Sequence, residues 1–218
     1  MNVAVIVFGG VGSRISSSLP KQFIKIKDKE LVIYTIEKFN SSPLIDEIVL
    51  VTNKDYLELT ISLVNKYKLD KVTHVFVGGE TRQESVKIAL ENTSYKNDDF
   101  VLIHDGDRPL VSEEIIFNNI KSLENHDVVC TAIKHINSNE KASNSGRKIE
   151  ISGERIDIQT PQSFRYGLIK SAHQNSNKEV SDDISLLEDK YEVFFVDGDK
   201  DNFKVTTNED LEYLKTIL

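Results

Sequence analysis

The sequence predicts an α/β protein with a mainly parallel sheet, helices on both faces of the sheet and a projecting β-arm. Apolar segments rich in β-branched residues alternate along the chain with segments that repeat apolar residues at helical spacing. This alternation is typical of parallel sheets covered by helices. A polar stretch at residues 134–153 then breaks the alternation, and it is long for a connection within one domain. These observations together define the fold class.

The predicted elements follow one another from the first residues onward. We expect strands at residues 3–8, 48–52, 72–77, 100–104 and 128–133. We expect helices at residues 31–39, 56–67, 82–90, 115–123 and 208–218. Three helix starts carry capping signals, namely Thr81 with Glu84, Ser112 before two glutamates, and Thr207 with Asp210.

The polar stretch predicts an arm instead of another strand–helix unit. It contains asparagine and serine clusters and a short alternating piece at residues 148–152, and regular patterns return from Tyr166. A β-arm at residues 134–157 would be a natural contact for a homodimer, and a mobile surface loop is the alternative. Since no repeat or linker interrupts the chain, we expect one domain over residues 1–218.

Composition excludes several functional classes. The 218 residues carry a net charge of −8, which disfavours binding to nucleic acid or to an anionic membrane. Cys130 is the single cysteine, so neither an internal disulfide nor a Cys/His zinc site is expected. The first apolar run has no basic region before it and is too short for a signal sequence or a membrane span. We therefore expect a cytoplasmic protein.

A glycine-rich turn follows the first predicted strand. It reads FGGVGSR at residues 8–14, and PKQ follows at residues 20–22. Backbone N–H groups of such a turn can hold phosphate oxygens, and Arg14 and Lys21 add positive charge. A Walker loop is excluded because Ser13 and Arg14 stand where it needs Gly-Lys-Ser/Thr. A dinucleotide fingerprint is disfavoured because Ile15 replaces its third glycine.

Four further segments combine glycine, charged and hydroxyl residues, and we expect them near strand ends or helix starts. They are GGETRQES at 78–85, IHDGDRP at 103–109, QTPQSF at 159–164 and DNFKVT at 201–206. In order with the first turn, these segments resemble the motifs of the cytidylyltransferases of methylerythritol 4-phosphate and of ribitol 5-phosphate. The resemblance covers nearly the whole chain.

The resemblance implies a fold, a reaction and partners. The fold is the nucleotidyltransferase-type, Rossmann-like α/β sheet, and the protein is a homodimer joined by an exchanged β-arm. The reaction transfers CMP from CTP to an alditol phosphate with Mg²⁺ as cofactor, giving a CDP-alditol and pyrophosphate. The acceptor is a phosphate monoester that is largely a dianion at neutral pH, so it needs no general base. Fixed cations and a metal are the expected catalysts.

The resemblance also implies roles for individual residues. The catalytic cations are Arg14, Lys21 and Lys204. The nucleotide-binding residues are Phe8, Gly9, Gly10, Gly12, Arg14, Lys21, Gly79, Glu80, Arg82, Ser85, Asp105 and Gly106. The acceptor-binding residues are Arg108, Thr160 and Arg155. The metal ligands are Asp105, whose carboxylate suits a hard cation, and Asp201.

The chain departs from the family pattern at three places that we assign to the acceptor side. Asp107 replaces a small residue, no Asp-Thr pair follows the fifth strand, and Ser152 stands where an arginine of the arm is usual, with Arg155 as its substitute. A carboxylate would repel an acceptor phosphate but would bind hydroxyl groups. We therefore predict ribitol 5-phosphate, or a close relative, as the acceptor.

Three alternatives remain open at this point. The first is a methylerythritol 4-phosphate cytidylyltransferase of isoprenoid biosynthesis. The second is a sugar-phosphate nucleotidyltransferase that uses another nucleotide, UTP or GTP. The third is a nucleotide-binding regulator without turnover, against which the intact Arg14, Lys21, Asp105 and Lys204 argue.

Overall fold

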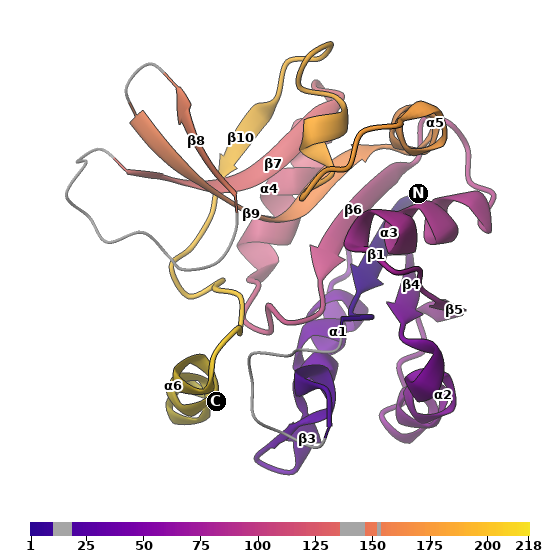
Figure 1. Cartoon of the computed structure of the whole chain (residues 1–218), viewed down its shortest axis with the longest axis vertical. Coiled ribbons are helices and arrows are strands. Elements are labelled where there is room, and N and C mark those ends of the chain that lie inside the picture. Colours follow the sequence, from indigo (N-terminus) through magenta and orange to yellow (C-terminus); the bar gives the residue numbers. More distant parts are fainter. Residues whose placement is uncertain (11–18, 136–146, 152–153) are drawn as a thin grey trace.

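An eight-stranded mixed sheet forms the centre of the molecule (Figure 1). The computed structural model describes residues 1–10, 19–135, 147–151 and 154–218. The strands run in the order β10-β7-β9-β6-β1-β4-β5, and β8 pairs with β9. Their bounds are β1 Asn2–Val7, β4 Glu47–Thr52, β5 Val72–Val77, β6 Phe100–Asp105, β7 Val128–His135, β8 Lys148–Ile151, β9 Glu154–Arg165 and β10 Phe194–Asp197. Two short strands, β2 Lys25–Ile26 and β3 Lys29–Glu30, pair separately.

Helices cover both faces of this sheet, as predicted. They are α1 Leu31–Ser41, α2 Leu57–Lys66, α3 Arg82–Glu91, α4 Glu113–Leu123, α5 Tyr166–Asn175 and α6 Asn208–Ile217. The side chains of β1 point alternately into two cores, because successive side chains of a strand point to opposite faces of the sheet. Val3, Val5 and Val7 pack in the core shared with α3 and α5. Ala4, Ile6 and Phe8 pack in the core shared with α1, α2 and α4.

The predicted elements and caps are confirmed. Each of the five predicted strands is present, and so is each of the five predicted helices. Thr81 and Glu84 form a capping box at α3, and Thr207 and Asp210 form one at α6. The Ser112 side chain accepts a hydrogen bond from the backbone N–H of Ile115 at the start of α4. These local signals fix where the helices begin.

The segment at residues 159–164 is not where we expected it. It lies inside the long strand β9, which is antiparallel to both β6 and β7 and runs between them. The β7–β9 register shifts between Cys130 and Ala132, so Pro161 stands at a bulge. A proline there costs no ladder hydrogen bond, because the bulged residues are unpaired. The residues of this segment therefore form part of a central strand, although their sequence does not indicate one.

Part of the predicted arm is visible as a three-stranded extension. β7 pairs with β9 as far as His135 and Arg155, and β8 pairs with the outer part of β9. In Figure 1 these strands leave the body of the sheet at the side away from β4 and β5. Residues 136–146 and 152–153 of the arm lie outside the described residues, and the dimer contact stays a prediction. Within the described parts of the chain, the helices are all too short or too polar to span a bilayer.

Candidate active site

Two adjoining pockets lie where β1, β6 and β9 meet the segments before α3 and α6. The first pocket has a volume of about 370 Å³ and is lined by Val7, Phe8, Gly9, Gly10, Lys21, Gln22, Gly79, Glu80, Thr81, Arg82, Ser85, Asp105, Asp107, Lys204 and Thr206. The second has a volume of about 430 Å³ and is lined by Arg82, Asp105, Arg108, Arg147, Ile158, Gln159, Thr160, Gln162, Ser181, Asp182 and Lys204. Arg82, Asp105 and Lys204 line both pockets and form the shared wall.

Segments at the carboxyl ends of parallel strands build the first pocket. β1 delivers Phe8 and the glycines after it, and β6 delivers Asp105, since these two strands pair side by side. Gly106 lies against Phe8, where an added Cβ would come within 2.8 Å of the Phe8 Cβ. Glycine at this position therefore permits the close approach of the two strand ends. The Gln22 amide donates to the backbone oxygens of Phe8 and Gly10, which holds the glycine turn in place.

Lys21 is a buried cation with two partners among the described residues. Its ammonium group donates to the Val205 carbonyl at 2.6 Å and lies 2.6 Å from an Asp107 carboxylate oxygen. The Asp107 carbonyl in turn accepts from the Val205 backbone N–H at 2.9 Å. An ammonium has three protons, so these two contacts orient Lys21 and leave one proton for a ligand.

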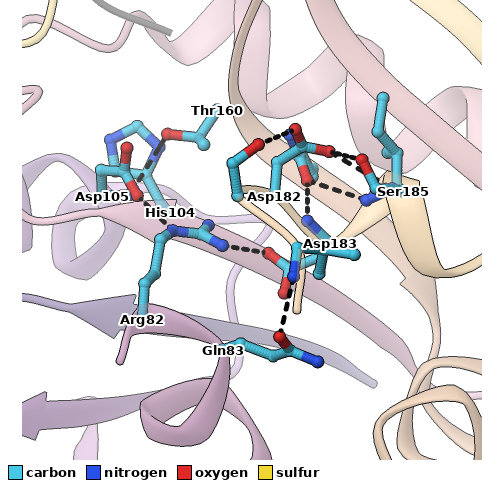
Figure 2. A network of polar contacts seen from close by, with 12 residues as sticks. Arg82, Gln83, His104, Asp105, Thr160, Asp182, Asp183 and Ser185 are labelled. Atoms are coloured by element: carbon cyan, nitrogen blue, oxygen red, sulfur yellow. Dashed lines mark hydrogen bonds and ion pairs between the residues drawn. The ribbon is translucent and has the colours of Figure 1, made fainter. Parts of the chain in front are cut away.

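Asp105 is the centre of the shared wall. Its Oδ1 accepts from Arg82 Nε at 2.9 Å, and its Oδ2 accepts from Lys204 Nζ at 2.9 Å (Figure 2 shows the Arg82 bond). Burial raises the pKa of Asp105, but the nearby Lys204 and Arg82 outweigh it and hold that pKa well below the usual range. The carboxylate is therefore ionised at neutral pH, and it couples the two cations.

The second pocket contains a buried arginine and a buried hydroxyl. Arg108 is 2% exposed, donates to the Asn202 carbonyl at 2.7 Å and lies 3.7 Å from Asp105. The Thr160 hydroxyl accepts from the Asp105 backbone N–H at 3.1 Å and contacts His104 Nδ1 at 3.1 Å. Burial lowers the pKa of His104 to about 4, so this imidazole is neutral at pH 7 and has a structural role.

Most of the predicted nucleotide-binding residues meet in the first pocket. These are Phe8, Gly9, Gly10, Lys21, Gly79, Glu80, Arg82, Ser85 and Asp105. Gly106 supports Phe8 from behind instead of lining the pocket. Gly12 and Arg14 lie outside the described residues. The acceptor-side predictions Arg108 and Thr160 line the second pocket, and Lys204 lines both.

Two predicted site residues lie away from both pockets. Arg155 is on β9 in the arm, where its guanidinium contacts Asp157 at 3.2 Å. Asp201 is exposed, and its backbone N–H bonds to the Asp199 side chain in a turn, so it shares no site with Asp105. The described residues hold no cluster of three or more potential metal ligands. A metal at Asp105 would take further ligands from a bound substrate and from water.

The placement of Asp107 corrects our assignment of it to the acceptor side. Asp107 lines the first pocket, not the second, and its carboxylate pairs with Lys21 and lies 3.8 Å from Lys204. Its negative charge is compensated by these two cations. Asp107 therefore gives no information about the hydroxyl groups of an acceptor, and one support for ribitol phosphate is lost.

Several pocket residues were not among the predicted site residues. In the first pocket they include Gln22 of the PKQ motif and Thr206 of the DNFKVT segment. In the second they include Gln159 and Gln162 of the QTPQ segment, Asp182 and Arg147. The glutamines could have been found in the sequence, because they belong to the PKQ and QTPQSF segments. Asp182 could have been found too, because it belongs to a run of polar residues, Ser-Asp-Asp, at 181–183. No sequence pattern marked Arg147, whose guanidinium bonds to Glu188 at 2.7 Å and lies 3.5 Å from Asp182.

A glycine turn at a strand end, a buried lysine and two pockets with a common charged wall are the arrangement expected of a nucleotidyltransferase. The family model described as 2-C-methyl-D-erythritol 4-phosphate cytidylyltransferase (IspD) matches residues 2–218. The chain belongs to this family and is an enzyme, a cytidylyltransferase.

Relatives and solved structures agree with this assignment. The 2-C-methyl-D-erythritol 4-phosphate cytidylyltransferase of Clostridium novyi (strain NT) is 38% identical, over all of this chain and 96% of the relative. The bifunctional enzyme IspD/IspF of Wolbachia pipientis wMel is 42% identical over 98% of this chain and 55% of its own length. The crystal structure of the Francisella tularensis IspD superimposes with a TM-score of 0.77 at 29% identity, covering 100% of this chain and 99% of that one.

Proposed function

We propose that the enzyme transfers CMP from CTP to 2-C-methyl-D-erythritol 4-phosphate, with release of pyrophosphate. The observation that carries this proposal is the wall of Arg82, Asp105 and Lys204 between two pockets, because a nucleotide and an acceptor on its two sides would react beside it. The names of the relatives favour methylerythritol phosphate over the ribitol phosphate that we predicted from the sequence. This acceptor would place the enzyme in isoprenoid biosynthesis.

The chemistry needs charge compensation and no general base. An oxygen of the acceptor phosphate attacks the α-phosphorus of CTP, a P–O bond forms, and the bond to the leaving pyrophosphate breaks. The attacking dianion is repelled by the triphosphate, so cations fixed on both sides lower the barrier. Lys21 lies on the triphosphate side, Arg108 lies on the acceptor side and Lys204 lies between them.

Ser85 favours cytosine over uracil as the base. Its hydroxyl donates to the Thr81 carbonyl at 2.9 Å, so towards a ligand the oxygen acts as an acceptor. The 4-amino group of cytosine donates a hydrogen bond, whereas the corresponding oxygen of uracil only accepts one. This argues for CTP and against UTP in a pocket where Ser85 is 3% exposed.

The residues present fit a magnesium ion bound together with the nucleotide. Mg²⁺ is commonly held by one or two carboxylates and by substrate phosphates. Asp105 would supply a carboxylate, since a carboxylate has lone pairs beyond the two that Arg82 and Lys204 occupy. When bound, the ion would neutralise charge on the triphosphate.

We also propose that two copies associate through the arm at residues 134–157. The support is the extension of β7, β8 and β9, in which β8 pairs with β9 alone among the described strands, beyond the body of the sheet. Light scattering after size exclusion should give twice the chain mass of 24.7 kDa. A monomeric mass for a variant with residues 136–146 replaced by a short glycine–serine turn would support the arm, and an unchanged dimer would contradict it.

A turnover assay tests the proposed function. The enzyme is mixed with Mg²⁺, a nucleotide and an alditol phosphate, and pyrophosphate release and the mass of the product are measured. We expect CTP with methylerythritol 4-phosphate to give the highest kcat/KM, with ribitol 5-phosphate and UTP well below. A higher kcat/KM for ribitol 5-phosphate would restore the other branch, and no turnover with CTP and any alditol phosphate would refute the proposal.

A further inference from the structure

Arg82 is held between two carboxylates that come from different parts of the chain. Its Nε donates to Asp105 at 2.9 Å, and its Nη1 donates to Asp183 at 2.7 Å (Figure 2). Asp105 belongs to the wall of both pockets, whereas Asp183 is absent from the lining of either. The Asp183 carboxylate therefore contacts the shared wall of the pockets through Arg82.

Both the side chain and the backbone of Asp183 are held by neighbouring residues. Its side chain is 1% exposed, its Oδ1 contacts His173 Nε2 at 3.1 Å, and its backbone N–H donates to the Gln162 side chain at 2.8 Å. Burial raises the pKa of Asp183, but Arg82 and the His173 hydrogen bond outweigh this effect and lower that pKa below its usual value. Asp183 thus presents a fixed negative charge to Arg82.

The segment that carries Asp183 is joined to the start of α3 at more than one point. The Gln83 side chain accepts from the Val180 backbone N–H at 3.0 Å and donates to the Lys178 carbonyl at 2.9 Å. Arg82 and Gln83, the first two residues of α3, are therefore both bound to residues 178–183. Several hydrogen bonds therefore hold this segment against the start of α3, and the Arg82–Asp183 bond is one of them.

We propose that Asp183 is a positioning residue that orients Asp105 through Arg82. By accepting from Nη1, Asp183 holds the guanidinium so that its Nε stays directed at Oδ1 of Asp105, the carboxylate assigned above to Mg²⁺. A partner that fixes a metal ligand from behind raises the affinity for the metal. This inference rests on the proposed function.

Asp183→Asn tests the inference, since the amide has the shape of the carboxylate but no charge. Calorimetry measures the affinity of CTP with and without Mg²⁺, and a titration gives the Mg²⁺ concentration for half-maximal turnover. We expect this concentration to rise about ten-fold, the scale of losing a partner behind a metal ligand, while metal-free CTP binding stays the same. Asp183→Glu keeps the charge and should shift the Mg²⁺ requirement less, and it serves if the amide variant is unstable.

A matched control and a double variant separate positioning from mere stabilisation. Asp99 is a buried aspartate paired with the N-terminal amine, remote from both pockets, so Asp99→Asn should lower the Tm and leave the Mg²⁺ response unchanged. In an Arg82→Ala background, Asp183→Asn should cause no further change, because Asp183 acts through Arg82. The inference would be overturned if Asp183→Asn had the same Mg²⁺ requirement as the wild type. It would also be overturned if Asp183→Asn raised the Mg²⁺ requirement of the Arg82→Ala variant further. Failure of the wild-type enzyme to bind CTP would instead refute the proposed function.

Discussion

The two pockets share a wall but are built in different ways. The first pocket is assembled from short segments that each follow a parallel strand, such as the glycine turn after β1 and the residues before α3. The second is assembled from β9, which crosses the sheet antiparallel to its neighbours, and from segments near residues 147 and 182. Local motifs therefore mark most residues of the first pocket, whereas Arg147 reaches the second only through the tertiary fold.

This difference explains why the residues of the first pocket were easier to predict than those of the second. Asp107 follows Asp105 by two residues, yet it faces Lys21 in the first pocket while Arg108, the next residue, lines the second. Neighbours in sequence thus line different pockets. Proximity to an acceptor motif is no guide to which pocket a side chain enters.

Changes in the shared wall should have the largest effect, because they act on both pockets. We expect activity to be lost in excess chelator and to return with Mg²⁺. Asp105→Asn should reduce kcat/KM by about three powers of ten and weaken the Mg²⁺ dependence, since a neutral amide is a poor ligand for a hard cation. Full activity in chelator would remove the metal from the account.

The lysines of the wall and of the first pocket should differ in which substrate they affect. Lys21→Ala and Lys204→Ala should each reduce turnover by roughly two to three powers of ten, the scale of losing one fixed transition-state donor. Lys204→Ala should also raise the KM of the alditol phosphate, because Lys204 lines the second pocket as well. Steady-state kinetics with each substrate varied measures this. As a control, Lys215→Ala changes an exposed lysine of α6 and should leave turnover at the wild-type level. Equal effects of Lys21→Ala and Lys204→Ala on the KM of the alditol phosphate would contradict the different placement of the two lysines.

Arg147 tests the second pocket alone. Its side chain is 27% exposed, so Arg147→Ala should fold, and it should raise the KM of the acceptor about ten-fold through loss of a charged contact. The KM of CTP should stay unchanged. Arg165→Ala, which removes a comparable surface arginine paired with Asp127, is the control. A change in the KM of CTP alone would contradict the assignment of Arg147 to the acceptor pocket.

Asp107 tests the first pocket and should give the smallest effect. Asp107→Ser removes a negative charge beside Lys21, so CTP should bind about five-fold more tightly, which corresponds to about 1 kcal/mol for one charge pair in high dielectric. Calorimetry with CTP and the KM of the acceptor measure the two sides separately. If the acceptor KM changed and CTP affinity did not, our assignment of Asp107 to the nucleotide side would be wrong.

The fold was predictable from sequence wherever a pattern is local. Strand composition, helical spacing and three capping signals located five strands and five helices. The strand β9 was missed because Pro161 argues against a central strand, and only the bulge beside β7 accommodates it. Arg147 was missed because a single arginine in a polar stretch has no pattern, and its place in the second pocket depends on the pairing of β8 with β9.

A crystal structure of the enzyme with the cytidylylated alditol product would show whether the two pockets hold the two halves of the product. We expect the cytosine in the first pocket near Ser85, the alditol in the second near Arg108, and the diphosphate across Arg82, Asp105 and Lys204. Both halves of the product on one side of this wall, or a diphosphate bound away from Lys204, would refute the division between a nucleotide pocket and an acceptor pocket.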